Sequence, residues 1–399
     1  MIAIVMLSAL DAHSFVGKQT IDGITYYIVT KGKTAKVTDT RTRGIVDLVI
    51  PATIECEGVT CDVVEIEAGA LSFDDDGYDY NKYLRSVTIG SNVKTIGIGA
   101  FSNCLNLQKI TFLNTDDLCI RRYAFEGCDA ITSVHCTNVS NWMKITFESD
   151  TSNPMYAAKS HLFFNNQHVK NLIIPDGVSK INPYAFLGCI DLESVTFPNT
   201  LTEIGKMAFP ECPKLTSITI PPSVRSIGSN NFCKCSQLTS ITLHCDIDRC
   251  FNNCPNLQSI IFGPLSSKVD ITSSFQSCPE LTDVYFYVSR VKDPYWGYWD
   301  TNKDLLVHLG DNYAFDGSEI KYTTLHVPDY CISAYCDTWP GPIVALTEEE
   351  TAVETPYPNK ECTTSMDVYD LGGQYHKTPQ KGVNIIRKSD GRTKKVYMK

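Results

Sequence analysis

The sequence predicts an α/β repeat solenoid, with parallel short strands on one face and short helical turns and second strand-like segments on the other. A phrase of about 23 residues recurs along the chain and carries Phe and Cys at fixed places. Each copy ends in an alternation of apolar and polar residues, which is typical of a strand. One copy alone buries too little apolar surface to fold, so neighbouring copies must stack. A small β-rich tail is predicted at the C-terminus.

Seven copies share the Phe position: Phe101, Phe125, Phe186, Phe209, Phe232, Phe251 and Phe275. Weaker copies lie at Leu71–Ile89 and Ala314–Val327. Most steps between these Phe residues are close to the repeat length, but the step from Phe125 to Phe186 is 61 residues and must contain an insertion.

One coil illustrates the apolar pattern that the repeat copies share. The stretch Leu215–Ile220 reads L-x-x-I-x-I and predicts a strand, and a second apolar pair, Val224 and Ile227, follows a proline turn. Phe232 and Cys235 are three residues apart, which places both on the inner side of a helical turn.

The predicted order of the chain is a signal peptide, an N-terminal capping hairpin, the repeats with two insertions, a C-terminal cap, a linker and a basic β-rich tail. The corresponding residues are 1–14, 15–72, 73–327 with insertions 137–170 and 287–312, 328–346, 347–365 and 366–399.

The apolar run Ile2–Leu10 is too short to cross a bilayer but fits the core of a secretory signal, so we expect export; a buried strand is the alternative. The formal net charge is −10, which argues against general binding of nucleic acid. Basic residues concentrate only after Gln374, so the rest of the chain is more acidic than the average.

Seven of the 17 cysteines occupy one repeat position, and we expect them to form a buried thiol ladder rather than a metal site. These are Cys104, Cys128, Cys189, Cys212, Cys235, Cys254 and Cys278. Cys56 and Cys61 flank a turn of a predicted hairpin and are the candidate disulfide. No metal or other cofactor is expected, and the nucleophile-elbow, zinc-protease and phosphate-loop motifs are absent from the sequence.

The outward strand positions are the candidate ligand-binding face. They are mostly small hydroxyl residues, which suit either a solvated strand or a ligand surface: Thr88, Thr111, His135, Thr196, Thr219, Thr242 and Tyr285. An aromatic patch is expected beside the last of them, at Tyr287, Tyr295, Trp296, Tyr298 and Trp299. These rings either capture a sugar or protein or fold back over the solenoid.

The segment Ile220–Ile241 reads I-P-P-S-V-x-x-I-G and continues to F-x-x-C-x-x-L-x-x-I, which resembles the BspA-like leucine-rich repeats of Bacteroides-type bacteria. The resemblance covers about Ile50 to Leu346, and it implies a leucine-rich-repeat fold in a secreted or surface protein without enzymatic activity. The tail resembles the short β-rich ends of exported proteins in these bacteria.

Relatives in this family are associated with adhesion, so the resemblance implies a binding protein, secreted or associated with the bacterial outer membrane. The expected partners are a host or matrix protein, a glycan or a neighbouring cell surface, with no nucleic acid and no transmembrane segment. Two alternatives are a structural surface protein that associates with itself and an accessory protein for carbohydrate degradation.

Overall fold

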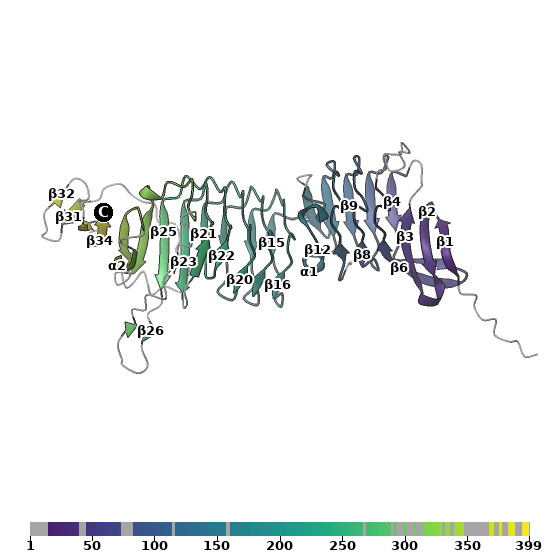
Figure 1. Ribbon diagram of the computed structural model, residues 1–399, viewed down its shortest axis with the longest axis horizontal. Helices are drawn as coiled ribbons and strands as arrows, with labels where there is room; N and C mark the ends of the chain where they lie inside the picture. The colour runs from purple at the N-terminus through teal and green to yellow at the C-terminus, as the bar shows by residue number, and fades with distance from the viewer. Residues whose placement is uncertain are drawn as a thin grey trace, which may run out of the picture. The chain divides into compact units, whose positions relative to one another are not determined.

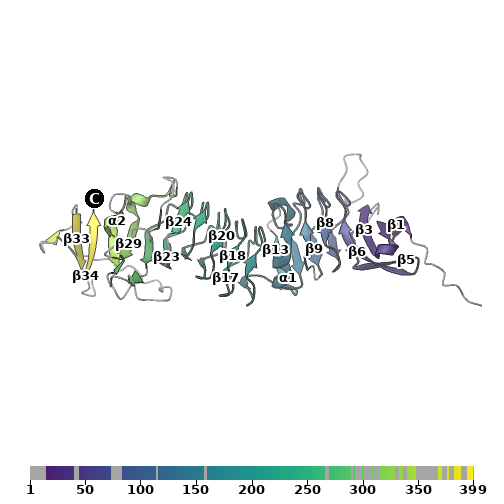
Figure 2. The ribbon, with the colours of Figure 1, turned by 60° about the horizontal axis from the view of Figure 1, so that its bottom comes forward.

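The computed structural model describes residues 15–39, 45–72, 83–113, 116–156, 160–265, 269–288, 291–292, 299–300, 307–308, 314–328, 332–335, 339–346, 367–370, 375–376, 382–387 and 393–398. The chain forms two compact units, unit 1 (Met1–Val169) and unit 2 (Lys170–Lys399). Both consist of stacked coils whose strands run side by side (Figure 1 and Figure 2). The predicted repeat solenoid is therefore confirmed. The predicted signal peptide lies outside the described residues.

Unit 1 contains two sheets. The first has the order β1-β2-β3-β6-β8-β10-β12, with β5 beside β6, and the second has the order β14-β13-β11-β9-β7-β4. The first-sheet strands are β1 (Val16–Ile21), β2 (Ile24–Val29), β3 (Thr34–Asp39), β5 (Thr53–Cys56), β6 (Val59–Ile66), β8 (Thr95–Ile96), β10 (Cys119–Ile120) and β12 (Thr146–Phe147). The second-sheet strands are β4 (Asp47–Ile50), β7 (Ser86–Ile89), β9 (Lys109–Phe112), β11 (Ser133–Cys136), β13 (His161–Phe164) and β14 (Gln167–His168).

The segment 137–170, expected as an insertion, adds one irregular coil to both sheets of unit 1. Helix α1 (Val139–Lys144) begins after Asn138, whose side chain accepts a hydrogen bond from the backbone of Asn141. Strand β12 then pairs in parallel with β10, and β13 pairs in parallel with β11. The short helix η2 (Asp150–Ser152) joins them.

Unit 2 continues the same pattern. Its longest sheet has the order β19-β21-β23-β25-β29-β30-β34-β33-β31-β32, and shorter sheets contain β15 with β17, β16 with β18 and β20, β22 with β24 and β28, and β26 with β27. The repeat strands are β15 (Asn171–Ile173), β16 (Lys180–Ile181), β17 (Ser194–Thr196), β18 (Glu203–Ile204), β19 (Ser217–Thr219), β20 (Ser226–Ile227), β21 (Ser240–Leu243), β22 (Ile247–Asp248), β23 (Ser259–Leu265), β24 (Val269–Thr272) and β25 (Asp283–Val288). Beyond them lie β26 (Val291–Lys292), β27 (Trp299–Asp300), β28 (Val307–His308) and β29 (Thr324–Pro328).

The C-terminal end of unit 2 closes the last coil. Helix α2 (Ile332–Tyr335) leads to β30 (Ile343–Leu346), which pairs in parallel with β29. Trp339 is fully buried, packs edge-on against Phe315 and donates its indole N–H to the carbonyl of Thr323 at 3.1 Å. Four antiparallel tail strands extend this sheet: β31 (Asp367–Asp370), β32 (Tyr375–His376), β33 (Gly382–Arg387) and β34 (Thr393–Met398).

The repeated Phe residues form a column in the core of each unit. Phe101 and Phe125 stack in unit 1 with ring centroids 5.2 Å apart. The column in unit 2 has centroid distances of 5.0 to 5.6 Å and consists of Phe186, Phe209, Phe232, Phe251, Phe275 and Phe315. All of these rings are buried, and they supply much of the apolar contact between successive coils.

The turn that carries Phe and Cys is tighter than the helical turn expected. Cys104 donates its N–H to the carbonyl of Phe101 at 3.1 Å, as in a 3-10 turn. A residue with positive φ lies two positions before each Phe and another two positions after it, so no helix can propagate. In the coil of Phe209 these residues are Met207 and Glu211.

Candidate functional site

The outward positions of the second sheet of unit 1 form one row across its strands. In register they are Val49, Thr88, Thr111, His135, Phe163 and His168. Val49 is 60% exposed at one edge, and Thr88 and Thr111 are half-buried between their neighbours. The face therefore changes from aliphatic and hydroxyl side chains at β4 to ring side chains at β13 and β14.

These rings form a stack. The centroids of His135 and Phe163 are 4.5 Å apart with the planes nearly parallel, and Phe163 and His168 are 5.1 Å apart. His161 meets His168 edge-on at 5.2 Å. Burial lowers the pKa of His135, and the positive charge of Lys109 on the neighbouring strand lowers it further. Nδ1 of His135 also lies 3.3 Å from Oδ1 of Asn166. Since stacked rings cover one another's faces, the stack presents mainly ring edges to a partner.

Unit 2 carries a similar row. Thr196 lies beside Ile173, and the long sheet aligns Thr219, Thr242, Ile261, Tyr285, His326 and Val344. Tyr285 and His326 stack with centroids 4.2 Å apart, and Tyr287 lies parallel to Tyr285 at 6.2 Å.

An acidic side chain fixes the histidine of this second row. Nε2 of His326 is 2.7 Å from Oδ1 of Asp283, and the side chain of His326 is only 11% exposed. The hydroxyl of Thr282 donates to the other carboxylate oxygen of Asp283 at 2.9 Å. The Tyr285 ring thus stacks on a side chain whose orientation is set by a hydrogen bond to Asp283 and by packing.

The structure places most of the predicted sheet-face residues at accessible positions. Thr196 and Thr219 are exposed, and Thr88, Thr111, His135 and Tyr285 are partly exposed. Thr242 differs, because it is only 7% exposed between its neighbours on β19 and β23.

Only part of the predicted aromatic patch can be described. Tyr287 is partly exposed and belongs to β25. Tyr295, Trp296 and Tyr298 lie outside the described residues, and Trp299 is described only by its backbone in β27.

Phe163 and His168 were missed by the sequence reasoning because 137–170 was expected to lie outside the repeats. A local signal was present. The segment His161–Phe164 precedes Asn165-Asn166, and both asparagines have positive φ, as a tight hairpin turn requires. That turn brings His168 opposite Phe163.

All seven cysteines of the repeat position are buried free thiols. Six of them donate a weak hydrogen bond to a carbonyl of the preceding coil. The pairs are Cys104 with Leu71, Cys128 with Phe101, Cys212 with Phe186, Cys235 with Phe209, Cys254 with Phe232 and Cys278 with Phe251, at 3.0 to 3.7 Å.

The candidate disulfide between Cys56 and Cys61 is not formed. Both residues are buried free thiols, and the register explains why: Cys56 lies opposite Val59, and Cys61 lies opposite Ile54. The two cysteines are therefore diagonal neighbours, which are too far apart for a disulfide without backbone movement. Cys56 instead donates to the side chain of Gln19 at 3.2 Å.

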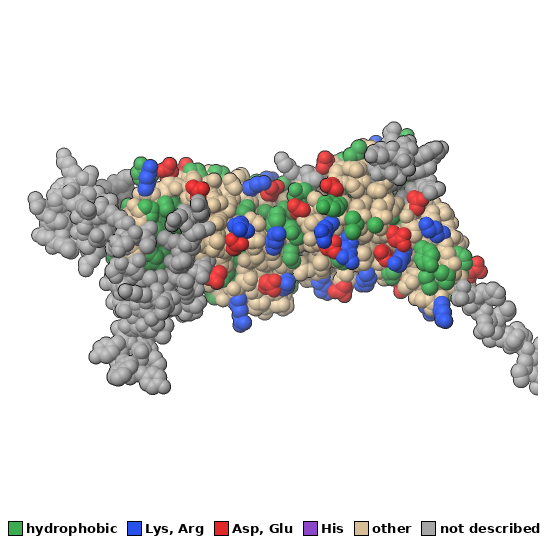
Figure 3. Space-filling view, in the orientation of Figure 1, with side chains coloured by type: hydrophobic (Ala, Val, Ile, Leu, Met, Phe, Trp, Pro, Cys, Tyr) green, Lys and Arg blue, Asp and Glu red, His purple; other side chains and the backbone are tan. Residues whose placement is uncertain are grey.

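Charged side chains of opposite sign lie among one another on the face of the molecule that Figure 3 shows. Several pairs join neighbouring coils outside the ring-bearing row, such as Lys180 with Glu203 at 2.8 Å and Lys234 with Glu211 at 2.6 Å. Exposed pairs of this kind stabilise little, but they neutralise the surface locally. None of the helices in the described part of the chain is long and apolar enough to cross a membrane.

Comparison with known proteins identifies the repeat. A cell surface protein of Faecalibacterium prausnitzii is 20% identical over 84% of this chain and 96% of its own, with a TM-score of 0.45. A leucine-rich repeat protein of Bacteroides ovatus is also 20% identical, over 82% and 100%, with a TM-score of 0.36. A comparison with curated proteins gave no match. The model of the BspA type leucine-rich repeat region matches residues 64–155 and 157–282 in six copies, more than half of the chain. The chain belongs to the BspA-type leucine-rich repeat family.

Proposed function

We propose that this chain is a non-catalytic, exported binding protein that recognises a host protein, a matrix protein or a glycan through the outward face of its strands. The observation that carries this proposal is the stack of Tyr285 on His326, which interrupts a face otherwise made largely of Ser, Thr and aliphatic side chains. Aromatic side chains dominate binding energy at protein interfaces because they bury a large area at a low entropic cost.

Two features support recognition at this place. Tyr285 and Tyr287 follow each other on one face of β25, so their parallel rings extend the contact area along the strand. His326 is held by Asp283, so Tyr285 rests on a support that loses little further freedom when a partner binds.

The proposal includes a location at the bacterial cell surface or outside the cell. Membership of the BspA-type leucine-rich repeat family supports it, as does the apolar run Ile2–Leu10. Export can be measured by expressing the full chain with a C-terminal tag in a Bacteroides host and fractionating the cells. Recovery in the cytoplasm alone would contradict this part of the proposal.

The binding itself is tested with the purified full chain on arrays of extracellular matrix proteins and of glycans. The informative variant is Tyr285→Thr, because Thr is what most coils carry at this position. We expect it to reduce binding about tenfold or more while the urea midpoint stays the same. Ile173→Thr is the matched control, since Ile173 is 68% exposed in the same row, away from the ring stack.

A second arm of the experiment tests the aromatic patch. Trp296→Ala with Trp299→Ala removes both tryptophans of the predicted patch. Binding that is weakened by this double change as well as by Tyr285→Thr would place the patch and the stack in one surface. If the double change leaves binding unaffected, the binding surface is limited to the stack of Tyr285 on His326.

A further inference from the structure

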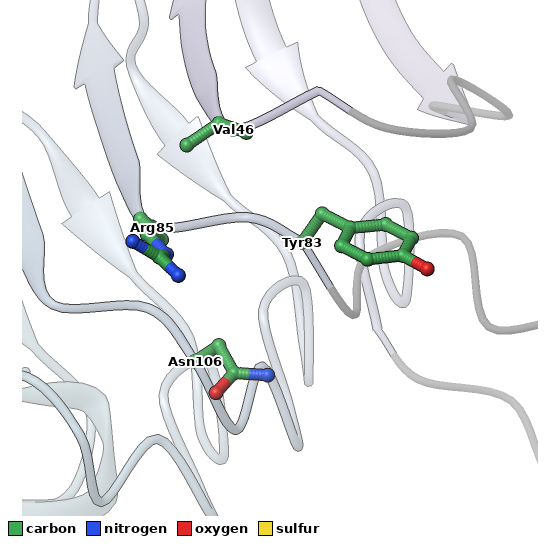
Figure 4. A pocket seen from close by; sticks show the side chains of 4 residues that line it. All are labelled: Val46, Tyr83, Arg85 and Asn106. Atoms are coloured by element: carbon green, nitrogen blue, oxygen red, sulfur yellow. The ribbon is translucent and has the colours of Figure 1, made fainter.

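Unit 1 contains a shallow pocket that lies apart from the ring stacks. Its volume is about 390 Å³, and the described residues that line it are Val46, Tyr83, Arg85 and Asn106 (Figure 4). Val46 directly precedes β4 and Arg85 directly precedes β7, so the pocket lies where the strands of the second sheet begin. Its size is at the small end of ligand pockets, which span ~300–1,000 Å³.

The side chains around the pocket differ in chemistry. Figure 4 shows Val46, Arg85 and Asn106 on one side of an open space and the ring of Tyr83 on the other. Tyr83 is 52% exposed and Val46 is 42% exposed, so both offer apolar surface to a ligand. Asn106 is exposed, and its amide both donates and accepts hydrogen bonds.

Arg85 gives the pocket its charge. Its guanidinium forms no ion pair among the described residues. Asp47 lies opposite Ser86 in the register, and its carboxylate accepts the hydroxyl of Ser86 at 2.5 Å. A guanidinium is a planar fork of donors that matches a carboxylate with two parallel hydrogen bonds. The pocket therefore suits a ligand that carries a carboxylate.

The backbone beside the pocket is already paired. The N–H groups of Arg85 and Ser86 both donate to the carbonyl of Val46, at 2.7 and 3.1 Å. The carbonyl of Arg85 accepts from Gln108 and Lys109, at 2.8 and 3.0 Å. These backbone groups of Val46 and Arg85 already have partners, so recognition at Arg85 falls to its side chain.

We propose that this pocket binds a carboxylate-bearing sugar residue. The carboxylate pairs with Arg85, the sugar ring lies against Tyr83 and Val46, and hydroxyl groups of the sugar exchange hydrogen bonds with Asn106. This site goes beyond the sheet-face function and is independent of it, because none of its four residues belongs to the ring stacks.

The test is a calorimetric titration of the full chain with trigalacturonate. Neutral trigalactose, inorganic sulfate and the peptide triglutamate serve as comparison probes. We expect trigalacturonate to bind with a dissociation constant on the order of 1 mM or below, as for a small ligand in an open site. Trigalactose, sulfate and triglutamate should each bind at least about tenfold more weakly, because each lacks either the carboxylate or the sugar ring.

Variants locate the site. Arg85→Gln should weaken trigalacturonate binding at least about tenfold, and Arg85→Lys should weaken it less, because it keeps the charge and loses the fork. Tyr83→Leu should weaken binding severalfold. Arg225→Gln is the matched control, since it removes an exposed arginine of unit 2. The proposal is overturned if trigalacturonate does not bind, if sulfate or triglutamate binds equally well, or if Arg85→Gln binds like the parent chain.

Discussion

The side-chain oxygen of Asn231 accepts the backbone N–H of Phe209 at 3.3 Å, and also that of Ala208 at 2.9 Å. Where the next coil carries Ala before its Phe, the backbone carbonyl of that Ala accepts the corresponding hydrogen bond. The N–H of Phe186, for example, donates to the carbonyl of Ala208 at 2.8 Å. The Asn231 amide also donates to the carbonyls of Gly205 and Gly228, at 2.8 and 2.7 Å. One buried side chain thus replaces a backbone contact between coils.

The coils in which another residue replaces Ala before Phe also differ in backbone conformation. Phe232, Phe251 and Phe275 have positive φ, whereas the Phe residues that follow Ala do not. The three coils concerned carry Asn231, Cys250 and Ser274 in place of Ala. A left-handed non-glycine residue costs about 1–2 kcal/mol, so compensating hydrogen bonds are needed at these coils.

Asn231→Ala should therefore destabilise the protein, although Ala is the more frequent residue at this position. Up to four backbone groups, three of them in buried contacts, lose a partner, which we expect to lower the free energy of unfolding by about 3 kcal/mol. Urea unfolding followed by circular dichroism measures this loss. The control is Asn256→Ala, because Asn256 is exposed and makes one hydrogen bond, to the carbonyl of Ser236. Equal midpoints for the two variants would contradict the role given to Asn231.

The buried thiols predict a loss of stability at alkaline pH. Burial raises the pKa of Cys245 and of Cys278 from the ordinary thiol value of 9.0 to about 12. The unfolded chain releases these protons first, so this contribution is fully present below pH 9.0 and disappears as the pH rises toward 12. For one such thiol the loss between pH 7 and about pH 10.5 is about 2 kcal/mol.

Urea midpoints at these two pH values test this expectation. Cys278→Ala should reduce the pH-dependent loss, because one buried thiol no longer titrates, whereas its own packing cost is the same at both pH values. If the variant loses as much stability between the two pH values as the parent chain, the Cys278 thiol does not contribute to the alkaline loss of stability.

Lys109 should control the protonation of His135. The lowered pKa of His135 comes first from burial and then from the charge of Lys109. Lys109→Met is expected to raise this pKa, as measured by an NMR titration of the imidazole. The unfolded state takes up the proton first, so this residue lowers stability as the pH falls below 6.5. Lys94→Met is the control, since Lys94 directly precedes β8 of the first sheet and donates to the carbonyl of Asp116. An equal shift in both variants would exclude a specific effect of Lys109.

The fold was predictable because it rests on a repeated pattern. Phe209 and Cys212 recur at one spacing, and that spacing requires both to face inward in every coil. The left-handed turns were not predictable in the same way, because Met207 and Glu211 adopt positive φ without being glycine or asparagine. Other coils do carry Gly or Asn at these positions, such as Gly99 and Asn103, so the left-handed residues were visible there but not in the coil of Phe209.

The candidate site was predictable only in part. Tyr285 lies in a regular coil, so its outward position followed from the alternation of β25. Phe163 lies in a coil without the repeated phrase, so its place beside His135 depends on the pairing of β13 with β11. The hydrogen bond between Asp283 and His326 joins residues 43 positions apart, and only the register of β25 with β29 brings them together.

The most direct test of the binding account compares the parent chain with Tyr285→Thr on the same array of matrix proteins and glycans, after equal urea midpoints have been established. The account predicts that the parent chain binds at least one class of ligand and that the variant binds it about tenfold more weakly or worse. A variant that binds every ligand of the parent chain with unchanged affinity would contradict the claim that the Tyr285–His326 stack is the recognition surface.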